Sequence, residues 1–297
     1  MAQNVTLEDI AKLPARRRES HKGDFGRVLV VGGSRGMVGA PALACNAALR
    51  GGAGLVTFAA PAAVQLAVAT LCPCATSIPL DCDEQGAPAP SAVRQLVEEA
   101  RKVDVLAVGP GMGVALGGQN LVRAALAQDL PVVLDADGLN NLARIDGWPA
   151  LRRCPLVLTP HPGEFARLTR RAIADIQARR EESALSAVRE WTDIRTENVP
   201  PLVCVLKGAG TVVTDGRRVF VNATGNPGMA TGGSGDILTG LTAALIGQGL
   251  DLFSAACQAV YCHGRAGDLG ARELGEVSLI ASDLLDYLPA ALREAAT

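Results

Sequence analysis

The amino-acid sequence predicts an α/β protein with three layers, in which helices cover both faces of a central, mostly parallel sheet. Two observations support this fold class. Short runs rich in valine and leucine, such as "RVLVV" at 27–31, lack polar alternation and are typical of strands that are buried on both faces. Longer stretches with helical spacing separate these runs, and strands that alternate with helices form parallel sheets.

The predicted elements follow one another in a regular order along the chain. The charged stretch "RRAIADIQARREESALSAVREW" at 170–191 is predicted to be one outer, solvent-facing helix. Two short strands around Asp215-Gly216 form a predicted hairpin at 210–222, and only helices follow it. The other predicted elements are strands at 27–33, 54–60, 104–111, 131–138, 155–164 and 201–208, and helices at 39–52 and 91–102.

Length, hydrophobicity and charge limit the class of protein. The chain has 297 residues, of which 48% are hydrophobic, and a formal net charge of −2. We expect one domain, 1–297, with residues 1–20 as an N-terminal extension. A charge near zero argues against nucleic acid or an anionic membrane as a partner. The absence of an apolar leader or a membrane-length apolar run favours a cytoplasmic protein.

The eight cysteines are scattered without paired C-x-x-C spacing. We interpret them as small buried hydrophobic residues of a reducing compartment rather than as disulfides or a zinc site. Cys72-Pro73-Cys74 forms one close cluster, and its proline and single-residue gap favour a turn over a metal site.

Glycine, histidine and acidic residues gather where the predicted strands end. In doubly wound sheets, ligands bind beyond the carboxyl ends of the strands. Five segments are therefore candidates for one common site: "GGSRG", "GPGMG", "DADGLN", "TPHPGE" and "KGAGT". The first of them does not match the G-x-G-x-x-G dinucleotide fingerprint and lacks the acid expected after the next strand, so we interpret it as a glycine turn.

The most specific signal is "NPGMATGGSGDILTG" at 226–240, which places Asp236 where a P-loop has its lysine. Gly233, Ser234 and Gly235 come just before it, at a predicted helix start whose free N–H groups form an anion hole. A carboxylate beside a phosphate is suited to take a proton from an attacking hydroxyl, which makes Asp236 the candidate catalytic base. The alternative role for this residue is that of a helix N-cap.

Two strand ends carry further candidate ligand contacts. His161 stands between two prolines, which excludes a regular helix or central strand and favours the mouth of a site, where it would hydrogen-bond a ligand. Glu164 is a candidate to hold Mg²⁺ through water. Lys207 in "KGAGT" is suited to pair with a phosphate while the glycines open the backbone to a nucleotide. A glycine turn with a surface lysine is an equal alternative for that segment.

Taken together, these segments resemble one branch of the ribokinase-like enzymes, the ADP-dependent NAD(P)H-hydrate dehydratases, which include the carboxy-terminal domain of YjeF-type proteins. The resemblance runs in the family's order from about residue 21 to 268. It implies a ribokinase-like fold and the ADP-dependent dehydration of (6S)-NADHX or NADPHX to NADH or NADPH, with release of AMP and phosphate. The matching segments are "HKGDFGRVLVVGGSRGMVGAPALACNAALRGGAGLV", "GPGMG", "DADGLN", "LTPHPGEFARL", "VLKGAGTVV" and "NPGMATGGSGDILTGLTAALIGQG".

The resemblance also implies roles for particular residues. Contacts to the hydrated dinucleotide fall on Ala40, Gly113, His161 and Asp236. Contacts to ADP or AMP fall on Lys207, Gly208, Ala209, Gly210, Thr211 and Gly235. Mg²⁺ as cofactor, a homotetramer, and a separate NAD(P)HX epimerase in the same pathway are further implications, since no epimerase domain precedes the matched segments.

The sequence departs from the family's motifs at two places. Ser234 replaces the family's usual threonine but keeps the hydroxyl, and "LCPCATSIPL" at 71–80 lacks the expected proline–glutamate pair. Two other functions fit the same motifs. A small-alcohol kinase of the same fold, such as a hydroxyethylthiazole-type kinase, is the main alternative. A non-catalytic nucleotide sensor is the second alternative function, and an acid at 236 argues against it. The sequence leaves open the choice of ADP or ATP and of NADHX or NADPHX.

Overall fold

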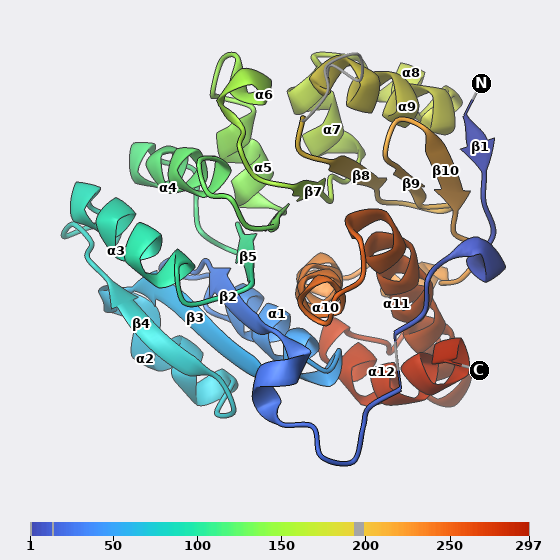
Figure 1. The fold of residues 1–297 in the computed structure, drawn as a ribbon, viewed down its shortest axis with the longest axis horizontal. Helices are drawn as coiled ribbons and strands as arrows, with labels where there is room; N and C mark the ends of the chain where they lie inside the picture. Colours follow the sequence, from blue (N-terminus) through green and yellow to red (C-terminus); the bar gives the residue numbers. More distant parts are fainter. Residues whose placement is uncertain (1, 14, 193–198, 297) are drawn as a thin grey trace.

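The structure, a computed structural model, describes residues 2–13, 15–192 and 199–296 (Figure 1). The strands within these ranges form one ten-stranded sheet in the order β1-β10-β9-β8-β7-β6-β5-β2-β3-β4. They are β1 (Gln3–Asn4), β2 (Arg27–Val31), β3 (Leu55–Pro61), β4 (Thr76–Leu80), β5 (Val105–Val108), β6 (Val132–Leu134), β7 (Leu156–Leu158), β8 (Leu202–Leu206), β9 (Val212–Thr214) and β10 (Arg218–Val221).

The sheet is mostly parallel, as predicted. Every neighbouring pair from β4 through to β8 runs parallel. The hairpin predicted at 210–222 is confirmed, because β9 pairs antiparallel with both β8 and β10. The short strand β1 adds parallel to β10 at the edge, with Gln3 opposite Arg218. This pairing places part of the predicted N-terminal extension in the sheet.

Helices cover both faces of the sheet, and Figure 1 shows α1, α2 and α10–α12 on one side and α3–α9 on the other. The helices are α1 (Gly39–Arg50), α2 (Ala62–Leu71), α3 (Pro90–Ala100), α4 (Leu116–Leu126), α5 (Asp137–Leu142), α6 (Trp148–Leu151), α7 (Pro162–Thr169), α8 (Ile173–Ala178), α9 (Arg180–Trp191), α10 (Ser234–Gly247), α11 (Leu252–Leu274) and α12 (Ala281–Ala296). Short 3₁₀ turns are η1 (Leu7–Asp9), η2 (Lys22–Phe25) and η3 (Pro227–Met229).

The buried strands supply both hydrophobic cores. In β2, Val28 and Val30 belong to the core under α1 and α10, whereas Leu29 and Val31 belong to the core under α3 and α4. This alternation explains why the sequence of the strand is apolar throughout, since each side chain faces one of two covered faces.

Three local predictions were incomplete or wrong. The segment 170–191 forms two helices, α8 and α9, because Arg179 leaves the helical conformation with φ −143° and ψ 60°. Helix α9 also buries one face, including Val188 and Trp191, so it is not only a solvent-facing helix. The segment 71–80, in which no strand was predicted, contains β4 at the sheet edge, where Pro79 is tolerated.

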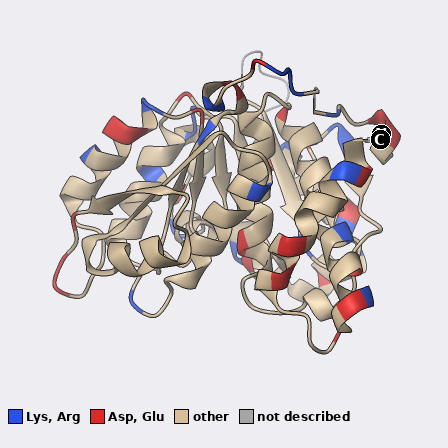
Figure 2. Ribbon diagram, turned by 90° about the horizontal axis from the view of Figure 1, so that it is seen from below, with Lys and Arg blue, Asp and Glu red and all other residues tan. Residues whose placement is uncertain are grey.

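The expectation for the cysteines is borne out in part, because six of the eight are buried and all eight are free. Cys72 is buried and Cys74 is exposed, both are free thiols, and the chain turns between them. The ribbon in Figure 2 shows positions of basic and acidic residues interspersed along the helices and loops. Within the part of the chain that the structure describes, no helix is long and apolar enough to cross a bilayer.

The fold brings the five candidate segments to one edge of the sheet. "GGSRG" follows β2, "GPGMG" follows β5, "DADGLN" follows β6, "TPHPGE" follows β7 and "KGAGT" follows β8. These five strands are consecutive neighbours in the sheet and run parallel, so their carboxyl ends lie side by side. Helix α10 contacts β2, β5 and β6 across the same region.

Candidate active site

The start of helix α10 has the geometry of an anion-binding turn. Gly233 is its N-cap residue and has φ +96°, a left-handed conformation that glycine adopts without strain. A Cβ at this position would lie 2.6 Å from a methyl carbon of Leu43, so a larger residue requires a shift of Leu43 or of the turn. The backbone N–H groups of Gly233 and Gly235 have no hydrogen-bond partner among the described residues. Free amides at a helix start, with the positive end of the helix dipole, bind anions.

Asp236 lies in the first turn of α10 but does not cap it. The N-cap position belongs to Gly233, and no side chain caps the helix there. The carboxylate of Asp236 accepts no hydrogen bond within the described ranges. The N-cap role that the sequence left open for Asp236 is therefore not the one the structure has.

Burial makes Asp236 an unusually basic carboxylate. Desolvation is the largest cause, followed by the negative charge of Asp135, and together they raise the pKa of Asp236 to about 7. Lys207 opposes this shift, and the charge of Asp137 adds to it. A carboxylate with a pKa near neutrality is matched to general base catalysis at neutral pH.

Lys207 is held beside the anion-binding turn by a buried partner. Its Nζ donates to Asp135 Oδ1 at 2.6 Å and lies 3.9 Å from Glu164 Oε2. Burial disfavours the charged amine, but Asp135 and Glu164 raise the pKa of Lys207 above its usual value. A Cβ built on Gly235 would lie 3.1 Å from the Nζ atom. Lys207 is thus a partly buried, ion-paired cation next to free amides, which does not fit the alternative of a surface lysine.

Asp135 is a site residue to which the sequence analysis gave no role. Its side chain is almost fully buried and accepts from Lys207 and, at 2.7 Å, from the Thr239 hydroxyl of α10. Ala136, which follows it, has φ 48°, a region that a non-glycine residue occupies at a cost of about 1–3 kcal/mol. This strained residue joins Asp135, which binds Lys207, to Asp137, which accepts a hydrogen bond from Gly113. Both acids of "DADGLN" therefore lie at the site.

His161 and Glu164 form a capping box at the start of α7. His161 Nδ1 accepts from the N–H of Gly163 at 3.0 Å, and Glu164 Oε2 accepts from the N–H of His161 at 2.8 Å. Because Nδ1 is an acceptor, the proton of the neutral ring is on Nε2. Burial and then Lys207 lower the pKa of His161, whereas burial raises the pKa of Glu164 to about 7.

The predicted dinucleotide contacts Ala40 and Gly113 belong to one wall of the site. Gly113 donates its N–H to Asp137 Oδ2 at 2.9 Å, and its carbonyl accepts from Asn141. Gly111, two residues before it, packs against Ala40 at the start of α1. Since Asp137 also acts on the pKa of Asp236, this wall lies close to the candidate base.

A cleft of about 730 Å³ opens on the other side of the anion-binding turn. It contains all five residues predicted to contact the nucleotide in "KGAGT", together with Ser234 and Gly235. Residues 221–227, 229 and 230 also line it, together with Val260, His263 and Gly264 from α11. Ala40, Gly113, His161 and Asp236 are not part of this cleft. The structure thus separates the predicted nucleotide contacts from the predicted substrate contacts, with Gly235 and Asp236 at their junction.

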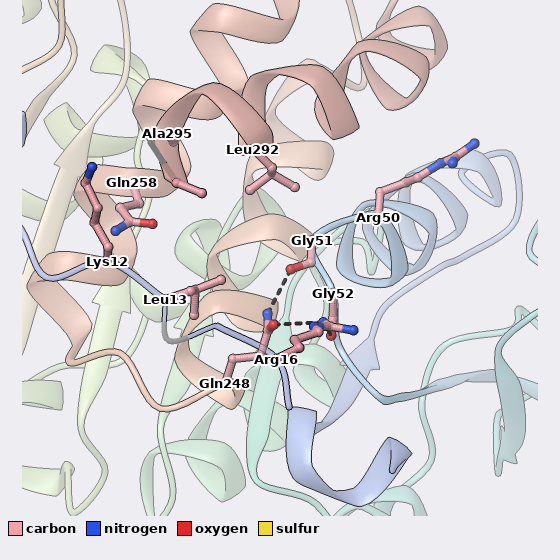
Figure 3. A pocket seen from close by; sticks show the side chains of 11 residues that line it. Lys12, Leu13, Arg16, Arg50, Gly51, Gly52, Gln248, Gln258, Leu292 and Ala295 are labelled. Carbon is pink, nitrogen blue, oxygen red and sulfur yellow. Dashed lines mark hydrogen bonds between the residues drawn. The ribbon is translucent and has the colours of Figure 1, made fainter. Parts of the chain in front are cut away.

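The second pocket, of about 200 Å³, lies at the far end of α10 (Figure 3). Gln248 and Arg16 bind each other and the carbonyls of Gly51 and Gly52. Figure 3 shows the side chain of Arg50 pointing away from these residues. These polar groups are already hydrogen-bonded to one another. We therefore interpret this pocket as a gap where the N-terminal segment packs on the rest of the fold.

The architecture and the site define the class of protein: a ribokinase-like α/β enzyme with an anion-binding turn and a basic carboxylate. Solved structures agree with this class. A Bacillus subtilis ADP/ATP-dependent NAD(P)H-hydrate dehydratase, co-crystallised with ATP and Mg²⁺, is 32% identical with a TM-score of 0.81 over 99% of both chains. A ribokinase-like superfamily protein from Enterococcus faecalis is 25% identical with a TM-score of 0.78, covering 99% of this chain and 96% of the other.

The chain belongs to the NAD(P)H-hydrate dehydratase family, whose profile matches residues 28–290. A bifunctional NAD(P)H-hydrate repair enzyme from Moorella thermoacetica is 46% identical over 286 residues, which are 95% of this chain and 52% of that protein. The Escherichia coli enzyme of the same name is 36% identical over 96% of this chain and 51% of its own length. The chain spans about half the length of these curated relatives. The predicted family and fold class are thereby confirmed.

Proposed function

We propose that this chain converts (6S)-NADHX and NADPHX to NADH and NADPH at the expense of ADP, releasing AMP and phosphate. The observation that carries this proposal is the uncapped, desolvated carboxylate of Asp236 beside the free amides of Gly233 and Gly235. A base next to an anion-binding turn is what the transfer of a phosphoryl group to a hydroxyl requires.

The chemistry proceeds in two steps. Asp236 takes the proton from the C6 hydroxyl of the hydrated ring, and the oxygen attacks the terminal phosphoryl group of ADP as the bond to AMP breaks. The amides of the anion-binding turn stabilise the developing negative charge. Phosphate then leaves C6 with its bonding electrons while C5 loses a proton, which restores the double bond of the dihydropyridine. Phosphate leaves far more readily than hydroxide, and this difference is the reason to consume a nucleotide.

The two ligands occupy the two sides of this junction. The cleft formed by Lys207 to Thr211 and Gly235 would hold ADP, and its volume of about 730 Å³ is in the range of small-molecule sites. Ala40, Gly113 and His161 would contact the hydrated dinucleotide on the other side of Asp236. The neutral His161 carries its proton on Nε2, which lies 3.3 Å from Glu164 Oε1, and on a half-exposed ring this donor would turn to the substrate when it binds.

Mg²⁺ fits the acidic groups of the site as a partner of the nucleotide. No group of three or more His, Cys, Asp or Glu side chains in the described ranges forms a metal cage by itself. Mg²⁺ does not require such a cage, since it is usually bound through one or two carboxylates, water and substrate phosphates. Glu164 would hold it through water, because its Oε2 already accepts from the N–H of His161. Bound there, the ion would neutralise charge on the phosphates.

Family membership also suggests partners and an assembly for this chain. The curated relatives are bifunctional repair enzymes of about twice the matched length. An epimerase that supplies the S form of the substrate would act with this chain, and a homotetramer is the assembly we expect. Analytical ultracentrifugation of the purified chain tests the second expectation.

Three assays of the purified chain test the proposed reaction. ADP, Mg²⁺ and NADHX are mixed, and the absorbance of reduced nicotinamide is followed together with AMP and phosphate. Stoichiometric appearance of all three supports the dehydratase. A stable phosphorylated alcohol without NADH would instead indicate a small-alcohol kinase, and nucleotide binding without turnover would indicate a sensor. Parallel assays with ATP and with NADPHX establish the preferred nucleotide and dinucleotide.

A further inference from the structure

Helix α11 contacts the nucleotide cleft through a row of polar groups. The carbonyl oxygens of Val260 and Tyr261 accept from Asn222 and Thr224 in the cleft wall. His263, one helical turn along, faces the start of α10 instead. It is therefore the residue through which α11 reaches the anion-binding turn.

The His263 ring is hydrogen-bonded to the backbone of that turn. Its Nε2 lies 2.9 Å from the carbonyl oxygen of Ser234 and 3.2 Å from the Ser234 hydroxyl. Desolvation lowers the pKa of His263 to about 4, so the ring is neutral at physiological pH. A carbonyl oxygen only accepts, so the proton of the neutral ring is on Nε2, which donates to Ser234.

The hydrogen bond from His263 to the Ser234 carbonyl also restrains the free N–H of Gly235. The carbonyl of Ser234 and the N–H of Gly235 belong to one planar trans peptide unit and point in opposite directions. A donor that fixes the direction of the carbonyl therefore fixes the direction of the N–H. The next carbonyl, that of Gly235, lies 3.1 Å from the hydroxyl of Thr239, which holds the following peptide unit. Ser234 and Gly235 open α10, and a restraint added to that of the helix has a large effect at a glycine, because it lacks a side chain that would limit its backbone.

A neutral donor also preserves the base. A lysine or arginine in place of His263 would bring a second cation to the site, where Lys207 already lowers the pKa of Asp236. The imidazole supplies the hydrogen bond without this effect. The His263 ring therefore fixes the direction of the Ser234 carbonyl without adding a charge to the site.

We propose that His263 is a positioning residue that aims the Gly235 amide at the phosphoryl group in the transition state. The inference rests on the proposed function, because it assigns the anion-binding turn to phosphoryl transfer. Negative charge at this amide is greatest in the transition state, so misalignment lowers kcat more than it weakens ADP binding. Loss of a whole donor of this kind costs about 10²–10³ in kcat, and we expect a misaligned donor to cost about 10–100-fold.

Two variants of similar size separate positioning from packing. His263→Met fills the volume without a donor, and His263→Gln offers an amide N–H close to the position of Nε2. We expect the first to lower kcat about 10–100-fold with an ADP KM within about threefold of wild type, and the second to recover most of kcat. His21→Gln is the matched control, since His21 is an exposed histidine at the start of η2.

The measurements are kcat and KM for ADP and NADHX in the full chain, ADP affinity by calorimetry, thermal unfolding, and the pH profile of kcat/KM. Equal kcat in wild type and His263→Met overturns the inference, even if the Tm falls. Loss of the acidic limb of the profile in His263→Gln also overturns it, because His263 would then be a titrating catalyst. If His263→Met does not fold, His263→Gln decides: kcat below one tenth of wild type contradicts the inference. An inactive wild-type chain that binds ADP would refute the proposed function instead.

Discussion

The two ends of helix α10 have nearly the same backbone feature and opposite consequences. Gly233 at the start has φ +96°, and Gly249 just after the end has φ +98°. At the end, Gly249 donates to Ile246 and Leu250 donates to Leu245, which is the Schellman pattern that satisfies the last carbonyls. At the start, the amides of Gly233 and Gly235 have no partner in the described ranges. A left-handed glycine therefore does not identify a site, whereas unpaired backbone groups do.

The same contrast holds for charge. At the far end of α10, Arg16 donates to the carbonyl of Gly52 and to Gln248, and its guanidinium lies over the ring of Phe25. At the near end, Asp236 is largely desolvated without a capping bond, and its pKa rises to about 7. The polar groups at the far end are thus hydrogen-bonded to one another, whereas those at the near end are left unpaired and can bind a ligand. The following predictions test this difference, in order of decreasing effect.

The largest effect is expected for Asp236→Asn. Asparagine has the same shape but does not accept the proton, so kcat for NADHX dehydration should fall by about 10²–10⁴. ADP affinity, measured by calorimetry, should stay the same or increase because a negative charge leaves the phosphate site. Wild-type activity in this variant would show that the carboxylate is not the base, and a loss of ADP binding would show that its role is structural.

Gly233→Ala should have the next largest effect. A left-handed alanine costs about 1–2 kcal/mol, and its Cβ would also lie 2.6 Å from a Leu43 methyl carbon. The strain at the positive φ, together with this clash, favours a shift of the turn that moves the free amides, so we expect kcat to fall about 10–100-fold. Steady-state kinetics and thermal unfolding test this, and a lower Tm with unchanged kcat would contradict the assignment of the turn to catalysis.

Activity should rise with pH across neutrality. The pKa of Asp236 is raised from its usual value to about 7, so the base is increasingly protonated as the pH falls through 7. kcat/KM, which reports on the free enzyme, should decline towards about tenfold per pH unit below that point. Glu164 titrates in the same range, whereas the pKa of His161 is lowered and its ring stays neutral there. A Glu164→Gln profile that keeps the acidic limb attributes it to Asp236, and a flat profile in wild type would refute the raised pKa.

The sequence was sufficient to predict the sheet and the helix start at Gly233, and to make Asp236 the candidate base, because each depends on local composition. The glycines around Asp236 and the apolar strands are visible within a few residues. The partner of Lys207 could not be predicted, because Asp135 lies 72 residues away in the sequence and meets it only through the order of β6, β7 and β8. His263 is also hidden, since a histidine within a helical stretch carries no signal of the carbonyl that it contacts.

Local signals also failed where tertiary structure decides. Helical periodicity over 170–191 did not show the break at Arg179. The Arg180 side chain that follows donates to the carbonyls of Leu206 and Lys207, so this break places a guanidinium beside the start of "KGAGT". A contact across 26 residues of sequence has no trace in the periodicity of one helix.

The smallest effect on catalysis is expected for Gly249→Ala, which matches Gly233→Ala at the other end of α10. Both glycines have nearly the same φ, so both alanines carry about 1–2 kcal/mol of backbone strain. A Cβ on Gly249 would meet no atom within 4 Å, and its position beyond the far end of the helix is about 20 Å from Asp236 at 1.5 Å per residue. We therefore expect a lower Tm with kcat and the ADP KM within about twofold of wild type. Parallel thermal unfolding and kinetics of the two variants separate strain from function: a similar loss of kcat in both would mean that strain in α10, and not the aim of the amides, limits the reaction.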